Sequence, residues 1–278
     1  MDIKDVFKDK GYLKILLLAI SLLLWVYFYS SSKASIAVLL SLNISNIAHS
    51  FISTNFLLFL LLFPLTSAIV VVLSTNKDKW VNFLQCLFGM GIGIIVSFLV
   101  FDLTKELIIF LNLFLISNLV VSLLVTSEYK ETNKVSKVNR YVRPKLNVFL
   151  IISLFVSVLL TVSPAQVIYR QSFEDGFVGL FVSGDIQKVS SFPNNDSQVQ
   201  QIAISEDQKE EMVSAIKSAI YSMPIFVLLL NHFALFSALF ISIISAVYFL
   251  IFFSLLYTVF TLLFFKILGS NENKEMLS

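Results

Sequence analysis

Residues 53–74 read STNFLLFLLLFPLTSAIVVVLS, and no charged side chain interrupts them. An α-helix needs about 20 apolar residues to cross the hydrocarbon core of a bilayer. This stretch is therefore long enough to be a transmembrane helix. Five further stretches meet the same criterion, at about 13–31, 81–101, 107–126, 146–164 and 237–265. We predict an all-α polytopic membrane protein with about six transmembrane helices.

The composition of the whole chain agrees with this fold class. Of 278 residues, 57% are hydrophobic and only 14% are charged, whereas a soluble domain is roughly a quarter charged. The chain has only 8 Gly and 5 Pro, so its long apolar runs lack the turns that an outer-membrane barrel needs. Composition thus excludes a soluble enzyme and favours helices over strands.

The basic residues are distributed unevenly between the two sides of the predicted spans. Only Lys33 and Lys105 lie in the short loops of one side, and the other side carries the remaining loop cations. Because cytoplasmic loops are enriched in Lys and Arg, we expect both termini in the cytoplasm, in the cell (inner) membrane. The largest cationic group lies between the fourth and fifth spans, as a loop that could also contact anionic lipid: Lys130, Lys134, Lys137, Arg140, Arg143 and Lys145.

Aromatic residues near one end of the first span suggest how it meets the membrane surface. Trp25, Tyr27 and Tyr29 lie close together there, and Trp80 lies at the start of the third span. Amphipathic rings are enriched at the level of the lipid headgroups. We therefore expect these residues to form interfacial belts.

Two apolar segments do not fit a simple count of spans. Residues 34–52 carry apolar side chains at helical spacing among Ser, Asn and His, which favours an interfacial or partly re-entrant helix. Residues 225–265 are too long for one crossing, so 225–236 is predicted as a lead-in to the span, with a tight hairpin as the alternative. The chain then divides into an N-terminal membrane region (1–165), an extracytoplasmic segment (166–222) and a C-terminal membrane region (223–278).

The segment 166–222 has a composition typical of water-facing protein, with four basic and eight acidic residues. Two strand-like runs, 177–183 and 186–192, flank Gly184-Asp185, which predicts a β-hairpin. A helix is predicted over about 206–222, with one apolar stripe that includes Met212, Ile216 and Ile220. So small a segment buries little of that stripe alone. We expect this small α+β element to use the stripe to contact a partner or another copy of the chain.

The sequence lacks the motifs of known catalytic and metal sites. It has no phosphate-binding loop, no H-E-x-x-H and no Cys-x-x-Cys, and its single cysteine, Cys86, lies in an apolar run. The two histidines, His49 and His232, lack neighbours of metal-ligand spacing. No catalytic residue, cofactor or metal is therefore assigned, and nucleic acid is not an expected partner.

Small and polar residues within the spans are the remaining candidates. Gly89, Gly93 and Ser97 recur every four residues, a pattern that allows another helix to approach closely, from the same chain or from a second copy. Gln85, Asn112 and Asn118 could line a polar path, or could join helices by hydrogen bonds.

Three classes of function remain after this reading. The first is a non-enzymatic membrane component of a larger assembly, which contacts a partner through its extracytoplasmic segment. The second is a channel or small-solute transporter, and the third is a membrane-embedded enzyme. An exposed apolar patch on the segment 166–222 would favour the first, polar residues around one lumen the second, and a convergent acid–base set the third.

Overall fold

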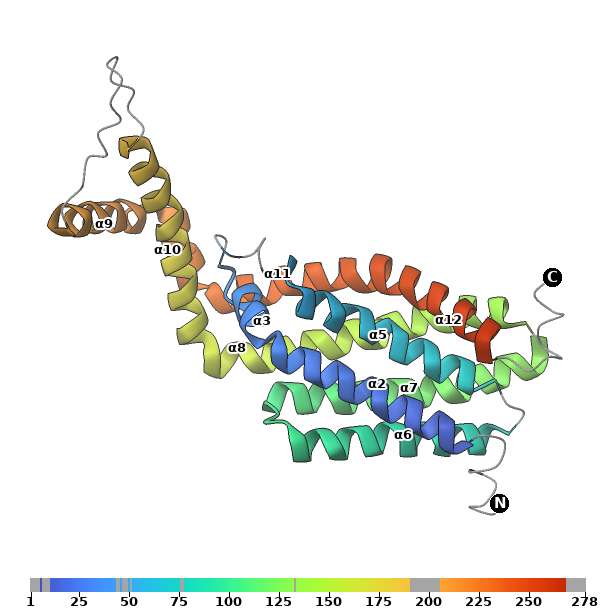
Figure 1. The fold of residues 1–278 in the computed structure, drawn as a ribbon. Helices are drawn as coiled ribbons and strands as arrows, with labels where there is room; N and C mark the ends of the chain where they lie inside the picture. Colours follow the sequence, from blue (N-terminus) through green and yellow to red (C-terminus); the bar gives the residue numbers. More distant parts are fainter. Residues whose placement is uncertain are drawn as a thin grey trace, which may run out of the picture. The chain divides into compact units, whose positions relative to one another are not determined.

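The computed structural model describes residues 6, 11–43, 46, 50, 52–75, 78–132, 134–190 and 206–268, and these are almost entirely helical (Figure 1). The elements are α2 (Gly11–Ser31), α3 (Lys33–Leu40), α5 (Thr54–Leu73), α6 (Lys79–Val100), α7 (Lys105–Thr132), α8 (Val135–Ser190), α9 (Glu206–Tyr221), α10 (Pro224–Asn231), α11 (Phe233–Val247), a π-helical segment (Tyr248–Phe253) and α12 (Ser254–Leu268).

Six helices in the described part of the chain are long and apolar enough to cross a membrane. They are Gly11–Ser31, Thr54–Leu73, Lys79–Val100, Lys105–Thr132, Val135–Leu159 and Phe233–Ile267. A seventh crossing would require Val213–Tyr221 and Pro224–Asn231 to act together, and these two are bent by 80° relative to each other. The chain is therefore a helical membrane protein with six candidate spans, as its sequence predicts.

The chain forms two compact units, which we call the bundle and the second unit. The bundle comprises Met1–Lys33, Ser53–Thr161 and Ile241–Ser278, and the second unit comprises Ala34–Ile52 and Val162–Phe240. Helices α8 and α11 each run from one unit into the other.

The bundle has an aromatic core centred on Trp25. Its indole lies 5.1 Å from the ring of Phe59, 5.3 Å from that of Phe63 and 5.6 Å from that of Phe110, measured between centroids. Trp25 is only 1% exposed, so its predicted place in an interfacial belt is wrong. Its side chain lies on the face of α2 that packs against α5 and α7, and burial of so large a ring outweighs its preference for the interface.

A proline in α5 is accommodated by a contact from the last span. Pro64 has no N–H and cannot donate to the carbonyl of Leu60, four residues earlier. The hydroxyl of Tyr248 donates to that same carbonyl oxygen. Tyr248 is also the first residue of the π-helical segment, so the irregular turn of one helix lies against the irregular turn of another.

The predicted β-hairpin does not form in the described residues. Residues 177–183 and 186–190 lie within α8, which continues to Ser190, and the rest of the predicted second strand lies outside the described residues. Phe173, Phe177 and Phe181 are spaced by four, so a helix brings them to one face. Phe173 and Phe177 stack there on Phe226 of α10, a tertiary contact that favours helix over strand.

The two uncertain apolar segments are both interrupted. The helix of 33–40 ends at Ser41–Asn43, where Leu42 has a positive φ of 51°, so no single helix covers 34–52. The lead-in predicted at 225–236 is split between α10 and the start of the last span at Phe233. The break before α10 follows from Pro224, because the residue before a proline is held extended, and Met223 has φ −77° and ψ 117°. The alternative of a tight hairpin is wrong, since the helix is continuous from Phe233 to Ile267.

Candidate functional site

The small-residue stripe of α6 lies against α2. A Cβ atom added at Gly89 would come within 2.8 Å of Leu18 Cβ, and one added at Gly93 within 3.0 Å of Leu22 Cδ2. Ser97 is fully buried and donates to the carbonyl of Gly93 at 2.7 Å. The contact is between helices of one chain, whereas an added Cβ at Gly91 meets nothing within 4 Å. In this chain the stripe serves intramolecular packing.

The three residues considered for a polar path do not converge. Gln85 is buried and donates to the carbonyl of Val6 at 2.7 Å. Asn118 is buried and donates to the carbonyl of Phe114 in its own helix at 2.8 Å. Asn112 is exposed and donates to the carbonyl of Ile108. Asn112 therefore lies on another face of α7 than Asn118, and these side chains do not surround one lumen.

A hydrogen-bonded group that the sequence reasoning missed joins α5, α6 and α7. Asn82 donates to the carbonyl of Ser74 at 3.0 Å and to the hydroxyl of Thr126 at 3.1 Å. Thr126 also donates to the carbonyls of Ser74 and Ser122. Ser74, at the C-terminal end of α5, is thus held to α6 and α7, which is a structural role.

The cationic stretch predicted as a loop is largely helical. Helix α7 continues to Thr132 and α8 begins at Val135, so the connection is only two residues long. Val138, Val142 and Leu146 are fully buried in the bundle core, and this packing extends the helix beyond the apolar run. The cations lie around that buried face: Lys130, Lys134, Lys137 and Arg140 are exposed, and Arg143 and Lys145 are half-buried.

A polar seam joins the first part of α8 to α12. Asn147 Nδ2 donates to the hydroxyl of Ser254 at 2.7 Å, and Arg143 Nη1 donates to that of Thr258 at 3.5 Å. On α8, Asn139, Arg143 and Asn147 follow one another every four residues, and the helix therefore places them on one stripe. This spacing is visible in the sequence and could have identified the seam.

The apolar stripe of α9 is covered by the second unit itself. Ile220 is only 2% exposed, and it lies in one cluster with Phe173 of α8 and Phe226 of α10. Ile216 packs against the same cluster, whereas the side chain of Met212 lies outside the described residues. Ile220 therefore does not present a surface to a partner, contrary to the prediction. Helix α8 covers this stripe because it continues through residues predicted to form a β-hairpin.

Other apolar side chains of the second unit are exposed. On α10, Ile225 is 74% exposed and Leu228 52%, and on α8, Val167 is 75% exposed and Ile168 70%. All four lie outside the six candidate spans. Val167 and Ile168 lie within the segment 166–222, where an exposed apolar patch would favour an assembly, and Ile225 and Leu228 lie just beyond that segment.

The polar side of the second unit carries an ion pair and a charge-assisted hydrogen bond. Glu174 accepts from Arg170 at 3.3 Å and from the hydroxyl of Tyr221 at 2.9 Å, which ties the end of α9 to α8. The hydrogen bond to Glu174 is the main cause of a raised pKa of Tyr221, with a smaller contribution from burial.

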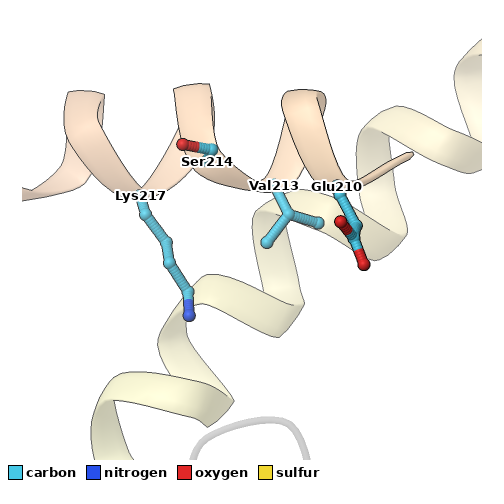
Figure 2. A pocket seen from close by; sticks show the side chains of 4 residues that line it. All are labelled: Glu210, Val213, Ser214 and Lys217. Carbon is cyan, nitrogen blue, oxygen red and sulfur yellow. The ribbon is translucent and has the colours of Figure 1, made fainter. Parts of the chain in front are cut away.

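An open depression lies beside α9. Glu210, Val213, Ser214 and Lys217 line this depression, and Figure 2 shows all four side chains coming from this one helix. So open a depression does not enclose a small molecule, and we assign no ligand to it.

No chemical site emerges within the described residues. They contain no group of three or more His, Cys, Asp or Glu side chains that could hold a metal ion. Cys86 is buried in the bundle with its sulfur 3.9 Å from that of Met90. Comparison with protein-family models, with curated proteins and with solved structures gives no match to this chain.

Proposed function

We propose that this protein is a non-enzymatic integral membrane component of a larger assembly, and that its second unit contacts a protein partner outside the cytoplasm. The observation that carries the proposal is the exposed apolar surface of α10, at Ile225 and Leu228, outside the candidate spans. Contiguous apolar surface of this kind marks sites of protein or membrane interaction.

The charged neighbours of this surface favour a protein over lipid tails. Helix α9 precedes α10 by two residues and exposes Glu210, Glu211 and Lys217. Carboxylates are costly among lipid tails, whereas an apolar centre with a polar rim is the usual anatomy of a protein interface. The excess of acids in 166–222 suits a partner whose rim is basic.

The transport alternative receives less support from the same structure. A path for a solute needs polar groups that face one lumen, and Gln85, Asn112 and Asn118 point to different surroundings. We therefore advance assembly as the only function.

The test compares two substitutions that introduce the same charge. The full chain carrying Ile225→Asp or Ser218→Asp is purified from membranes in mild detergent, and co-purifying proteins are quantified by mass spectrometry. Both positions are exposed, so both variants should remain folded and inserted. We expect Ile225→Asp to lose a partner that the wild type and Ser218→Asp retain. Equal recovery from all three chains would refute the proposed contact.

The substitution Ile216→Asp is not a suitable test. Ile216 is half-buried against the core of the second unit, so a charge there would disturb its fold as well as any interface. Loss of a partner would then have two explanations.

A further inference from the structure

We infer that the seam between α8 and α12 binds the phosphate of an anionic phospholipid headgroup, with Arg143 as its principal ligand. This site lies within the bundle and does not depend on the partner contact proposed above. Of the six cations predicted to contact anionic lipid, Arg143 and its nearest neighbours are thus the ones that bind it.

Arg143 is a half-buried cation with a long, weak hydrogen bond to α12. Its guanidinium carries five N–H donors, and one of them makes a long hydrogen bond of 3.5 Å to the hydroxyl of Thr258. No carboxylate pairs with it among the described residues, and neither 135–159 nor Ser254–Leu268 contains an acidic residue. An arginine at the end of a membrane span, without an acidic partner, is suited to bind a bidentate anion such as phosphate.

The two helices place further positive charge at the same end of the seam. The bonds from Asn147 to Ser254 and from Arg143 to Thr258 fix an antiparallel register, in which Lys266 of α12 lies level with the start of α8. Arg140 is exposed one turn before Arg143, and α8 places the two on adjacent positions. The cationic surface is thus shared by both helices.

Buried polar atoms line the seam beside Arg143. Asn139 and Asn147 are 4% and 3% exposed, and the Oδ1 atom of each has no hydrogen-bond partner in the described structure. The two residues lie one turn before and one turn after Arg143. The oxygen and nitrogen of an amide can exchange places by a half-turn, so Asn147 can accept from Ser254 and direct its N–H donors elsewhere. In that orientation Asn147 would offer N–H donors beside Arg143, whereas an unpaired Oδ1 atom is an acceptor and does not attract an anion.

Apolar surface next to Arg143 indicates a lipid and not a free anion. Leu255 and Val259 of α12 are 62% and 51% exposed, and Val148 of α8 is 54% exposed. Leu255 lies three residues before Thr258 and Val148 five residues after Arg143, toward the interior of the spans, and Val259 adjoins Thr258. Exposed aliphatic side chains beside a cation match a molecule with a charged head and hydrocarbon tails.

The test measures lipid binding to the full chain in nanodiscs or mixed micelles by native mass spectrometry. Phosphatidylglycerol is titrated against a background of phosphatidylcholine for the wild type, Arg143→Gln and Lys134→Gln. Lys134 is exposed and directly precedes α8, whose start lies about 12 Å along the helix from Arg143, so its variant removes the same charge away from the seam. We expect Arg143→Gln to weaken phosphatidylglycerol binding at least tenfold, as for loss of a charge-assisted hydrogen bond. Lys134→Gln should weaken it by about fivefold or less, the effect of one surface cation.

Two further arms make the result decisive. Arg140→Gln alters an exposed residue that does not support folding, and it should weaken binding more than Lys134→Gln does. Equal losses in all variants would overturn the site, because they would reflect diffuse attraction between charges. Displacement of phosphatidylglycerol by millimolar inorganic phosphate would also overturn it, because a free anion would then be the ligand.

Discussion

Replacing Tyr248 with Phe removes one oxygen atom from the bundle and leaves the carbonyl of Leu60 without its donor. In wild type the hydroxyl of Tyr248 supplies the hydrogen bond that Pro64 cannot give. A buried carbonyl without a partner costs about 1–3 kcal/mol, and hydrogen bonds between membrane helices average about 0.6 with a maximum near 1.7 kcal/mol. We therefore expect Tyr248→Phe to destabilise the bundle by about 1–2 kcal/mol.

The cause is tested by repeating the substitution in a Pro64→Ala background. The alanine introduced there has an N–H that can donate to the carbonyl of Leu60 within α5, so the hydroxyl of Tyr248 becomes dispensable. In that background Tyr248→Phe should cost less than about 0.5 kcal/mol, since the carbonyl keeps a donor. The difference between the two costs is a coupling energy of about 1 kcal/mol, well within what neighbouring residues show.

Thermal unfolding in mild detergent, followed by the fraction that stays monodisperse, measures each cost. For a chain of this size, 1 kcal/mol corresponds to about 2–4 °C, so Tyr248→Phe should lower the midpoint by roughly 2–8 °C. Tyr27→Phe is the control, because the side chain of Tyr27 is 51% exposed. The reasoning fails if Tyr248→Phe has the same cost in the Pro64→Ala background as in the wild-type chain.

Three further substitutions test other contacts by the same unfolding assay. Gly93→Leu should cost about 3 kcal/mol because α2 lies within 3.2 Å of an added Cβ, whereas Gly91→Leu should be tolerated, and equal costs would place the stripe on a free surface. Asn82→Ala should cost about 1–2 kcal/mol because it removes the hydrogen bonds to Ser74 and Thr126. The control Asn112→Ala, at an exposed position, should cost less than about 0.5 kcal/mol, and the reverse order would be inconsistent with the structure. Tyr221→Phe should cost about 0.5–1 kcal/mol at pH 8 through the lost bond to Glu174. Because that bond raises the pKa of Tyr221 above 10.0, the difference from wild type should be constant well below pH 10 and decline as the pH rises through 10.0 toward the raised pKa. A loss that is already complete well below pH 10 would contradict this origin.

The sequence predicts the spans well because their signal is local. Each needs only about 20 apolar residues in a row, and the candidate spans Thr54–Leu73 and Lys79–Val100 end within two residues of the predicted bounds. The close approach of α6 to another helix at Gly89 and Gly93 is equally predictable from the sequence, since only small residues at a four-residue spacing allow it.

The errors arose where tertiary contacts decide between local alternatives. Residues 177–183 are rich in Phe and Val, as short strands are, yet Phe173 and Phe177 also share a helical face. Their contact with Phe226 favours the helix. Trp25 is compatible with an interface until the rings of Phe63 and Phe110 surround it. These contacting rings are all far from Phe173 and Trp25 in sequence, so the pattern along the chain could not identify them.

Tertiary contacts also decide which apolar residues of the second unit are exposed to a partner. The stripe that includes Ile216 and Ile220 is amphipathic in sequence, which indicates that something covers it but not which element. The prediction assigned this cover to a partner, whereas α8 and α10 provide it for Ile220. Once α8 and α10 provide the cover, the exposed apolar residues of the second unit include Ile225 of α10 and Val167 of α8.

Site-specific photo-crosslinking in living cells tests most directly whether this exposed surface contacts a protein. A photoreactive amino acid replaces Ile225 in one chain and Leu239 in another, a residue that is 57% exposed and lies in the candidate span Phe233–Ile267. The account predicts a discrete protein adduct from position 225 and only lipid adducts from position 239. Lipid adducts alone from position 225 would contradict the account and would place α10 against the membrane.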